Sequence, residues 1–163
     1  SGSVRDNVLL LAPSTRPELV ASALRIAALE EDLSGFPSGL DTQIGELGVR
    51  VSGGQRQRMG LARALAAHTP DTPGLLVLDD PFSAVDVETE ARILAALQAA
   101  FGPERPERER VTIVLCSQRL AAFPQADRVV VLADGRIAEE GTHAELLSRG
   151  AVYARIYRAQ AGI

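Results

Sequence analysis

The stretch Val51–Arg58, which reads VSGGQRQR, constrains the fold of this chain most strongly, because it predicts a loop that turns into a helix. Ser52 is suited to be the N-cap, since its hydroxyl can accept a hydrogen bond from a free N–H group of the first helical turn. The two glycines after it let a ligand approach the backbone closely. The following residues are mostly good helix formers, with one apolar stripe through Met59, Ala62 and Ala66. An exposed helix start of this kind is suited to binding phosphate.

A family resemblance follows from this stretch and its surroundings. Val51–Gln55 resembles the signature motif, usually Leu-Ser-Gly-Gly-Gln, of the ABC-transporter ATPase family. A bare Ser-Gly-Gly also fits an ordinary capped helix, but the match extends from Gly45 to Leu65 and is followed by LLVLDDP at Leu75–Pro81. The resemblance covers Ser1 to about Tyr157 and is of the exporter type. It corresponds to the C-terminal portion of the ATP-binding domain, without the Walker A motif and the Q-loop.

This resemblance implies an α/β fold of the P-loop NTPase (ABC ATPase) type. Residues 1–67 are expected to form the α-helical signature subdomain. Residues 68–163 are expected to form the C-terminal part of a RecA-like core, with a partial parallel sheet that carries the Walker B motif, the D-loop and the switch loop.

The basic residues set a limit on nucleotide binding, because all 17 of them are arginine. A P-loop needs a lysine that contacts the β- and γ-phosphates. These 163 residues have no lysine and therefore contain no P-loop. They are therefore either a fragment of a longer polypeptide, which we expect, or a protein that does not bind nucleotide in the usual way. The net charge of −4 argues against nucleic acid as the main partner. The single cysteine, Cys116, excludes a disulfide framework. No apolar run approaches the ~20 residues of a membrane helix.

The N-terminal third predicts helices and one exposed acidic loop. Thr15 and Glu18 have the spacing of a capping box, and the apolar pattern after them predicts a helix from Leu19 to about Leu33. The segment around Glu46 resembles the X-loop of exporters, in which an acidic residue touches the transmembrane domain. Glu46 is equally well explained as a solvated loop carboxylate.

The C-terminal part alternates strands and helices. Apolar runs predict buried strands at Leu75–Leu78, Val111–Cys116 and Arg128–Ala133, the first of them buried on both faces of a parallel sheet. Asp86 is the expected N-cap of a helix from Val87 to Phe101. Asp134-Gly135 predicts a hairpin turn.

The last stretch predicts two further helices. Thr142 and Glu145 predict a second capping box, and a final amphipathic helix is expected from Ala151 to about Ala161. His143 beside that box is expected to be structural, and His68 to be a surface residue without a role.

The family's chemistry transfers to this chain by position. Asp79, the Walker B aspartate, matches the Mg²⁺ ligand. The signature, which reaches the phosphate of ATP bound to the opposite subunit, corresponds to Ser52, Gly53, Gly54 and Gln55. Asp86 of the D-loop completes the expected nucleotide-binding residues. The two catalytic positions depart from the pattern: Asp80 stands where the family has glutamate, and Gln118 where it has the switch histidine.

Both departures point to a weak nucleotide site. Aspartate withdraws its carboxylate by about one bond length, and misplacement of that order can cost ~10²-fold in rate. Glutamine has no titratable nitrogen and cannot carry a proton near neutral pH. The intact signature serves the other site of a head-to-tail dimer. We therefore expect one half of a heterodimeric exporter, with a slow homodimer or deliberate substitutions as alternatives.

The expected assembly is an ATPase at the cytoplasmic face of a cell membrane, using ATP and Mg²⁺. Its partners are a second ABC ATPase domain and a transmembrane domain reached through the Glu46 region. The alternatives are a soluble ABC-type ATPase, or a non-catalytic fragment or regulatory module. The isolated chain is expected to bind ATP poorly, and to self-associate or fold marginally because its sheet has an unprotected edge or apolar face.

Overall fold

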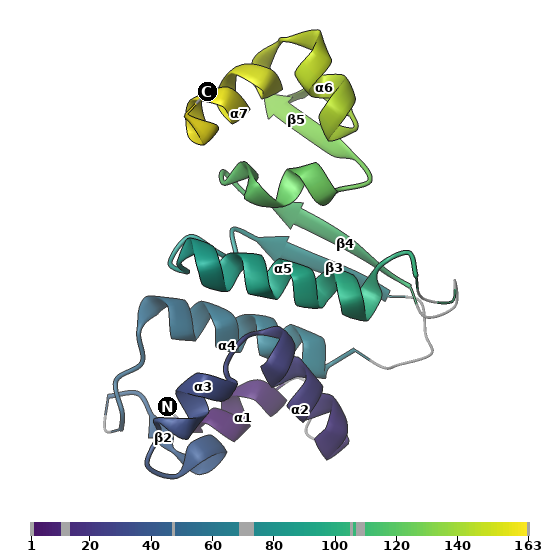
Figure 1. Cartoon of the computed structure of the whole chain (residues 1–163). Helices are drawn as coiled ribbons and strands as arrows, with labels where there is room; N and C mark the ends of the chain where they lie inside the picture. Colours follow the sequence, from purple (N-terminus) through teal and green to yellow (C-terminus); the bar gives the residue numbers. More distant parts are fainter. Residues whose placement is uncertain are drawn as a thin grey trace. The chain divides into compact units, whose positions relative to one another are not determined.

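The computed structural model of the chain describes residues 2–10, 14–46, 48–68, 74–104, 106 and 110–162 (Figure 1). The chain forms two compact units, Ser1–Ser117 and Gln118–Ile163, which we describe one at a time. The boundary expected after Ala67 stays a prediction.

The first unit contains short helices followed by a strand, a long helix and a second strand. Its elements are β1 (Gly2–Ser3), α1 (Val4–Leu9), α2 (Pro17–Ile26), α3 (Glu30–Ser34), the 3-10 helix η1 (Gly39–Asp41), β2 (Gln43–Ile44), α4 (Gly53–Ala66), β3 (Gly74–Asp79), α5 (Val87–Phe101) and β4 (Val111–Cys116). The second unit contains the 3-10 helix η3 (Leu120–Gln125), β5 (Val129–Ala133), β6 (Arg136–Gly141), α6 (His143–Arg149) and α7 (Val152–Ala161).

Helix α4 is the centre of the helical part, with α1 and α2 packed against it. The apolar stripe predicted from the sequence is buried, with Met59, Ala62 and Ala66 at most 3% exposed. Arg63 on the same helix donates to the backbone oxygen of Asn7 at 2.6 Å, which joins α4 to α1. The stripe that the sequence predicts is therefore the one that builds this core.

The single helix expected from Leu19 to Leu33 is wrong, because the chain forms α2 and α3 with a break between them. The break lies at Ala28, whose φ of 52° is left-handed and incompatible with a continuous helix. The expected Thr15–Glu18 capping box is also wrong. The N-cap is Arg16, without a side-chain cap bond, and the Thr15 hydroxyl instead donates to the backbone oxygen of Ala66 at 3.1 Å.

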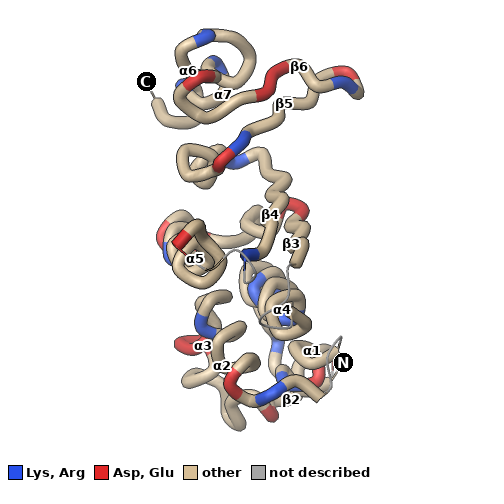
Figure 2. The backbone as a smooth tube through the Cα atoms, turned by 90° about the vertical axis from the view of Figure 1, so that its right-hand side faces the viewer, with Lys and Arg blue, Asp and Glu red and all other residues tan. Residues whose placement is uncertain are grey.

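Strands β3 and β4 form a parallel pair that runs in register from Gly74 opposite Val111 to Asp79 opposite Cys116. Helix α5 lies along one side of this pair (Figure 2). On that side Leu76 and Leu78 are buried, together with Ile93 and Leu97 of α5. The parallel arrangement places the carboxyl ends of both strands at one edge of the pair, where α/β proteins bind ligands.

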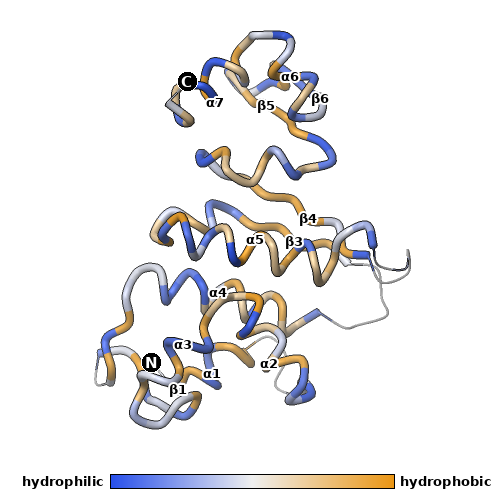
Figure 3. Tube along the Cα trace, in the orientation of Figure 1, coloured by the Kyte–Doolittle hydropathy of each residue, from blue (hydrophilic) through white to orange (hydrophobic). Residues whose placement is uncertain are grey.

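The expected burial of β3 on both faces is wrong. Leu75 and Val77 are 67% and 59% exposed, and Val114 on β4 is 44% exposed on the same side. Both strands are nevertheless strongly hydrophobic along their length (Figure 3). The two faces are both apolar in sequence, but only the face toward α5 and α4 is covered within the described residues. The expected exposed apolar face is therefore present.

The second unit is a hairpin with two helices. Strands β5 and β6 are antiparallel, and the turn between them has left-handed φ values of 49° at Asp134 and 71° at Gly135, as the sequence predicts. The burial expected for the strand at Arg128–Ala133, which is β5, is wrong in part, because Val130 is 47% and Leu132 is 72% exposed. A small core of Leu120, Val129, Leu146 and Tyr153 holds the hairpin to α6 and α7.

The capping box predicted at the start of α6 is confirmed. The Thr142 hydroxyl accepts from the Glu145 amide at 3.3 Å, and the Glu145 carboxylate accepts from the Thr142 amide at 2.9 Å. His143 Nδ1 lies 2.7 Å from the Tyr153 hydroxyl, which agrees with the structural role expected for it. His68, expected at the surface, is half-buried and packs edge-on against Phe101 with ring centroids 5.7 Å apart.

Within the part of the chain that the structure describes, no helix combines the length and the hydropathy that a bilayer span requires.

Candidate functional site

The start of α4 has the capped geometry that the sequence predicts. The Ser52 hydroxyl accepts from the Gln55 amide at 3.1 Å, and the Gln55 side-chain oxygen accepts from the Ser52 amide at 2.8 Å. This reciprocal capping box was not expected, although Ser-x-x-Gln is one of its signatures. Gly53 and Gly54 follow as the first helical residues, and their N–H groups have no partner within the helix. The exposed Ser52 turn therefore presents N–H groups suited to a phosphate.

The side chain of Gln55 is held at both ends. Its amide nitrogen donates to Asp32 Oδ1 at 2.8 Å while its oxygen is engaged by the Ser52 amide. Arg58 donates to the other oxygen of Asp32 at 2.6 Å and also to the backbone oxygen of Ala28. The turn expected to grip a phosphate is thus anchored to α3 through a glutamine and a carboxylate.

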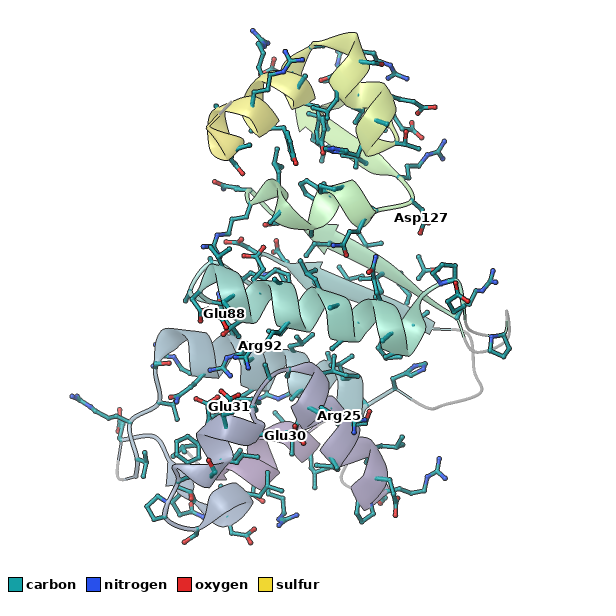
Figure 4. The ribbon with its side chains drawn as sticks, viewed as in Figure 1. Arg25, Glu30, Glu31, Glu88, Arg92 and Asp127 are labelled. Carbon is teal, nitrogen blue, oxygen red and sulfur yellow. The ribbon has the colours of Figure 1, made fainter. Side chains whose placement is uncertain are left out.

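Asp32 is a site residue that the sequence reasoning missed, since no local pattern signals a contact over this separation. Partial burial acts to raise the pKa of its carboxyl, but hydrogen bonds from Arg58 and Gln55 outweigh burial and hold that pKa below its ordinary value. Asp32 is therefore charged at neutral pH and oriented toward α4. Glu31, the neighbour of Asp32 in the sequence, forms a more exposed ion pair with Arg92 of α5 at 3.0 Å (Figure 4).

A second set of contacts joins α4 to the loop after β3. Gln57 donates to the Ser83 hydroxyl at 2.6 Å and accepts from the Ala84 amide at 2.9 Å. Close to these bonds, Gly54 lies so near the loop that an added Cβ would come within 2.6 Å of the Ala84 oxygen. The helix start and the loop expected to be the D-loop are in direct contact.

The two acidic residues after β3 differ in their backbone. Asp79 ends the strand and is exposed. Asp80 has a left-handed φ of 44°, a conformation that aspartate tolerates better than most residues. Its amide donates to the Cys116 oxygen at 2.8 Å, which keeps the turn attached to β4. The pair therefore leaves the sheet at the edge where a ligand is expected.

The donor set at Asp79 fits Mg²⁺. This ion usually keeps several waters and takes one or two carboxylates together with substrate phosphate oxygens. An exposed carboxylate at a strand end meets that requirement. Within the part of the chain that the structure describes, no group of three or more histidine, cysteine or acidic side chains is arranged to hold a metal.

Asp86 has a structural role that is fully visible. Its carboxylate accepts from the Thr89 amide at 2.8 Å and caps α5, as predicted. Hydrogen bonds from Thr89 lower the pKa of Asp86, so the cap is charged at neutral pH. Its role toward a nucleotide stays a prediction.

Gln118 opens the second unit and is exposed. Its backbone oxygen accepts from the Gln160 side chain at 2.7 Å, and the same side chain accepts from the Leu120 amide at 3.0 Å. Gln160 of α7 therefore orients this segment, another contact that the sequence did not indicate. Glu46 is exposed just after β2. The catalytic role of Gln118 and the partner contact of Glu46 both stay predictions.

Comparison with known proteins decides the family. No family model matches the chain. It is 40% identical over 162 residues to an uncharacterized ABC transporter ATP-binding protein of Bacillus subtilis, and 41% identical over 160 residues to the cyclolysin secretion/processing ATP-binding protein of Bordetella pertussis. These matches cover 99% and 98% of the chain. The ATP-dependent lipid A-core flippase of Chromobacterium violaceum is 44% identical over 147 residues, or 90% of the chain.

The chain belongs to the ATP-binding proteins of ABC transporters. Its structure is also similar to that of a bacterial Atm1-family ABC exporter solved with ATP bound, with a TM-score of 0.80, 32% identity and 98% of the chain covered. The predicted α/β fold of the ABC ATPase type, with a partial parallel sheet, is therefore confirmed. The chain spans about a quarter of the length of these ABC proteins, covering 26%, 21% and 23% of the three relatives and 26% of the solved chain.

Proposed function

We propose that this chain is the part of an ABC exporter's ATP-binding domain that presents a signature turn to one ATP and a Walker B carboxylate to another. The observation that carries the proposal is the exposed Ser52 turn, held by Gln55 and Asp32 at the start of α4. The likeness of the whole chain to ABC transporter ATP-binding proteins supports it.

The two roles belong to different nucleotides. Ser52 and the N–H groups of Gly53 and Gly54 bind the terminal phosphate of an ATP held by a second ABC ATPase domain. Asp79 holds Mg²⁺ for the nucleotide on its own domain. Bound Mg²⁺ neutralises charge that develops on the phosphates. The carboxylate of Asp80 orients the attacking water, and Gln118 donates a hydrogen bond toward the phosphate.

The nucleotide site built on Asp79 is degenerate in this proposal. Asp80 places its carboxylate about one bond length short of the family's glutamate, and Gln118 cannot carry a proton near neutral pH. The signature turn is unaffected and serves a competent site on the partner. The protein is therefore one half of a heterodimeric exporter; a homodimer with two slow sites is the second candidate.

Turnover of ATP by the full-length protein tests this. We expect slow hydrolysis alone and at least ~10-fold faster hydrolysis with the correct partner subunit. The double variant Asp80→Glu with Gln118→His should raise turnover in the absence of the partner. Brisk turnover by the unmodified protein alone, lost in Asp80→Asn, would show that its own site is competent.

Placement at the cytoplasmic face of a cell membrane is part of the same proposal. The segment around Glu46 contacts the transmembrane domain, so Glu46→Ala should weaken transport more than ATP hydrolysis. Asp41→Ala is the control, because Asp41 is also an exposed acidic residue of this region. Equal loss of transport in both variants would argue against a specific contact.

Two other functions are separable by experiment. A soluble ABC-type ATPase would hydrolyse ATP without any effect of a transmembrane domain; the names of the relatives in secretion and lipid A flipping favour transport. The other alternative is a regulatory module that acts without the rest of an ATPase. In that case the isolated 163-residue chain would itself bind Mg-ATP. Calorimetric titration should show no micromolar binding, since these residues contain no P-loop lysine.

A further inference from the structure

Gln57 lies one turn inside α4 and uses both ends of its side-chain amide on a single loop. Its oxygen accepts from the Ala84 amide at 2.9 Å, and its nitrogen donates to the Ser83 hydroxyl at 2.6 Å. The nitrogen also lies 3.4 Å from the backbone oxygen of Asp80. Because the Ala84 N–H can only donate, the orientation of the amide is determined by the contact itself.

The loop that Gln57 contacts has its own exposed surface. Ser83 and Ala84 are both exposed, while Phe82 and Val85 on either side of them are buried. Phe82 and Val85 therefore anchor the two ends of this segment in the core, and Gln57 hydrogen-bonds to the two exposed residues between them. The Asp80 turn enters this loop with a left-handed backbone, and its carbonyl faces the same amide.

The helix and the loop approach closely enough that displacing one displaces the other. A Cβ on Gly54 would come within 2.6 Å of the Ala84 oxygen, and one on Gly53 within 3.3 Å of the Ala84 Cβ. This close approach leaves the start of α4 and the loop little freedom to slide past each other. Gln57 adds directional bonds to that contact.

We propose that Gln57 is a positioning residue that makes the D-loop move with the signature helix of its own chain. The inference rests on the proposed function. In it, the Ser52 turn serves one nucleotide and the segment from Asp79 to Asp86 serves the other. Gln57 joins the two, so that engagement of one phosphate by the Ser52 turn orients Asp80 toward the other.

The amide chemistry predicts a graded series of variants. Gln57→Ala removes both bonds. Gln57→Glu keeps an acceptor for the Ala84 N–H but can meet Ser83 only if its hydroxyl reverses to donate, and it repels the Asp80 carbonyl. Gln98→Ala on α5 is the matched control, since it makes the same substitution at an exposed helical position. Ser83→Ala removes one of the two bonds.

The test uses the assembled full-length transporter, with ATP as the probe. Gln57→Ala should lower kcat by about 10- to 100-fold, the range expected for misplaced catalytic groups, because the Ser52 turn that serves the partner's competent site also loses its attachment to the loop. KM for ATP should change less than about 2-fold. Gln57→Glu should fall between wild type and Gln57→Ala. Ser83→Ala should lower kcat less, and should add almost nothing in the double variant with Gln57→Ala, because the shared bond is already lost.

Hydrogen exchange at the Ala84 amide reports the contact directly. It should speed up in Gln57→Ala and stay unchanged in Gln98→Ala. An unchanged kcat in Gln57→Ala would overturn the inference. The inference would also be overturned if thermal unfolding showed that the Gln57→Ala variant loses kcat only in proportion to a loss of folded protein. If wild-type protein hydrolyses no ATP in the assembly, the proposed function fails instead, and the exchange result still shows whether Gln57 holds the loop.

Discussion

Gln55 and Asp32 are joined by a hydrogen bond of 2.8 Å, from the side-chain amide of the signature glutamine to a carboxylate 23 residues earlier in the chain. The other end of Gln55 accepts from the amide of Ser52. The backbone turn expected to meet a phosphate is therefore oriented by a residue of α3 that does not belong to the signature. This chain of contacts makes the stability of α3 and the geometry of the signature turn interdependent.

Asp32→Asn should lower the free energy of unfolding of the full-length protein's ATP-binding domain by about 1–3 kcal/mol. The reason is that Arg58 would lose its charged partner in a mostly buried setting, where both side chains are at most 17% exposed. Asp41→Asn is the control, because Asp41 pairs with Arg5 in an exposed, solvent-screened ion pair, so this variant should lose less stability than Asp32→Asn. Urea denaturation measures both, and equal losses would contradict the anchoring role of Asp32.

Gly54→Ala and Gly60→Ala should have opposite effects on stability, although both lie in α4. At Gly54 the added methyl group would meet the Ala84 backbone at 2.6 Å, so helix and loop must separate. At Gly60 nothing lies within 4 Å, and alanine should stabilise the helix by about 0.5–1 kcal/mol. Thermal unfolding checks the signs. Tolerance of alanine at Gly54 with unchanged ATP turnover would show that the close contact with the loop is dispensable.

Asp80→Asn should separate the backbone role of this position from its charge. Asparagine also tolerates the left-handed conformation found here, so we expect stability to change by less than about 0.5 kcal/mol. Residual ATP turnover at this chain's own site should be lost, because an amide cannot act as the carboxylate does. A variant with unchanged turnover would remove Asp80 from the proposed catalytic residues.

Stability should fall at acidic pH through carboxylates that are hydrogen-bonded in the folded state. Such hydrogen bonds lower the pKa values of both Asp32 and Asp86. At Asp32 burial acts in the opposite direction, but the hydrogen bonds outweigh it. Their contributions are complete above the ordinary carboxyl pKa of about 4 and are lost as the pH falls through the lower folded values. Urea midpoints between pH 7 and pH 2 measure this.

Asp86→Asn provides the matching variant for the pH series. Asparagine is as good an N-cap as aspartate, so stability at pH 7 should change little. The decline below about pH 4 should become shallower, because one titrating carboxylate has been removed. An unchanged acid decline would mean that the Asp86 cap does not contribute to it.

The isolated 163-residue chain should self-associate through the exposed face of β3 and β4. Leu75, Val77 and Val114 form an apolar surface there, and exposed apolar patches promote association. The double variant Leu75→Thr and Val77→Thr keeps β propensity while making that face more polar. Sedimentation velocity should then show more monomer. A wild-type chain that sediments as a single monomer would contradict this expectation.

Local patterns were sufficient to predict several helix starts. Ser52, Asp86 and Thr142 are each confirmed as N-caps, with partners three residues further along the chain. Such contacts need no other part of the fold. The same rule failed at Thr15, because the hydroxyl found a partner on α4, 51 residues away.

Burial of the strands was predictable only in part. A run of apolar residues such as Leu75–Leu78 indicates a strand, but it cannot show which faces are covered. Leu76 and Leu78 are buried, while Leu75 and Val77 are exposed on the other side. Which face is covered depends on where α5 lies, and no local spacing contains that information.

Taken alone, the sequence determined the signature turn, the acidic pair after β3 and the family, because each depends on residues that are neighbours along the chain. Tertiary structure decided how these parts are connected. Asp32 reaches Gln55 across 23 residues, and Gln57 reaches Ala84 across 27. The physical reason is that a hydrogen bond needs its two atoms within about 3 Å, and only the folded path of the chain brings such distant residues that close.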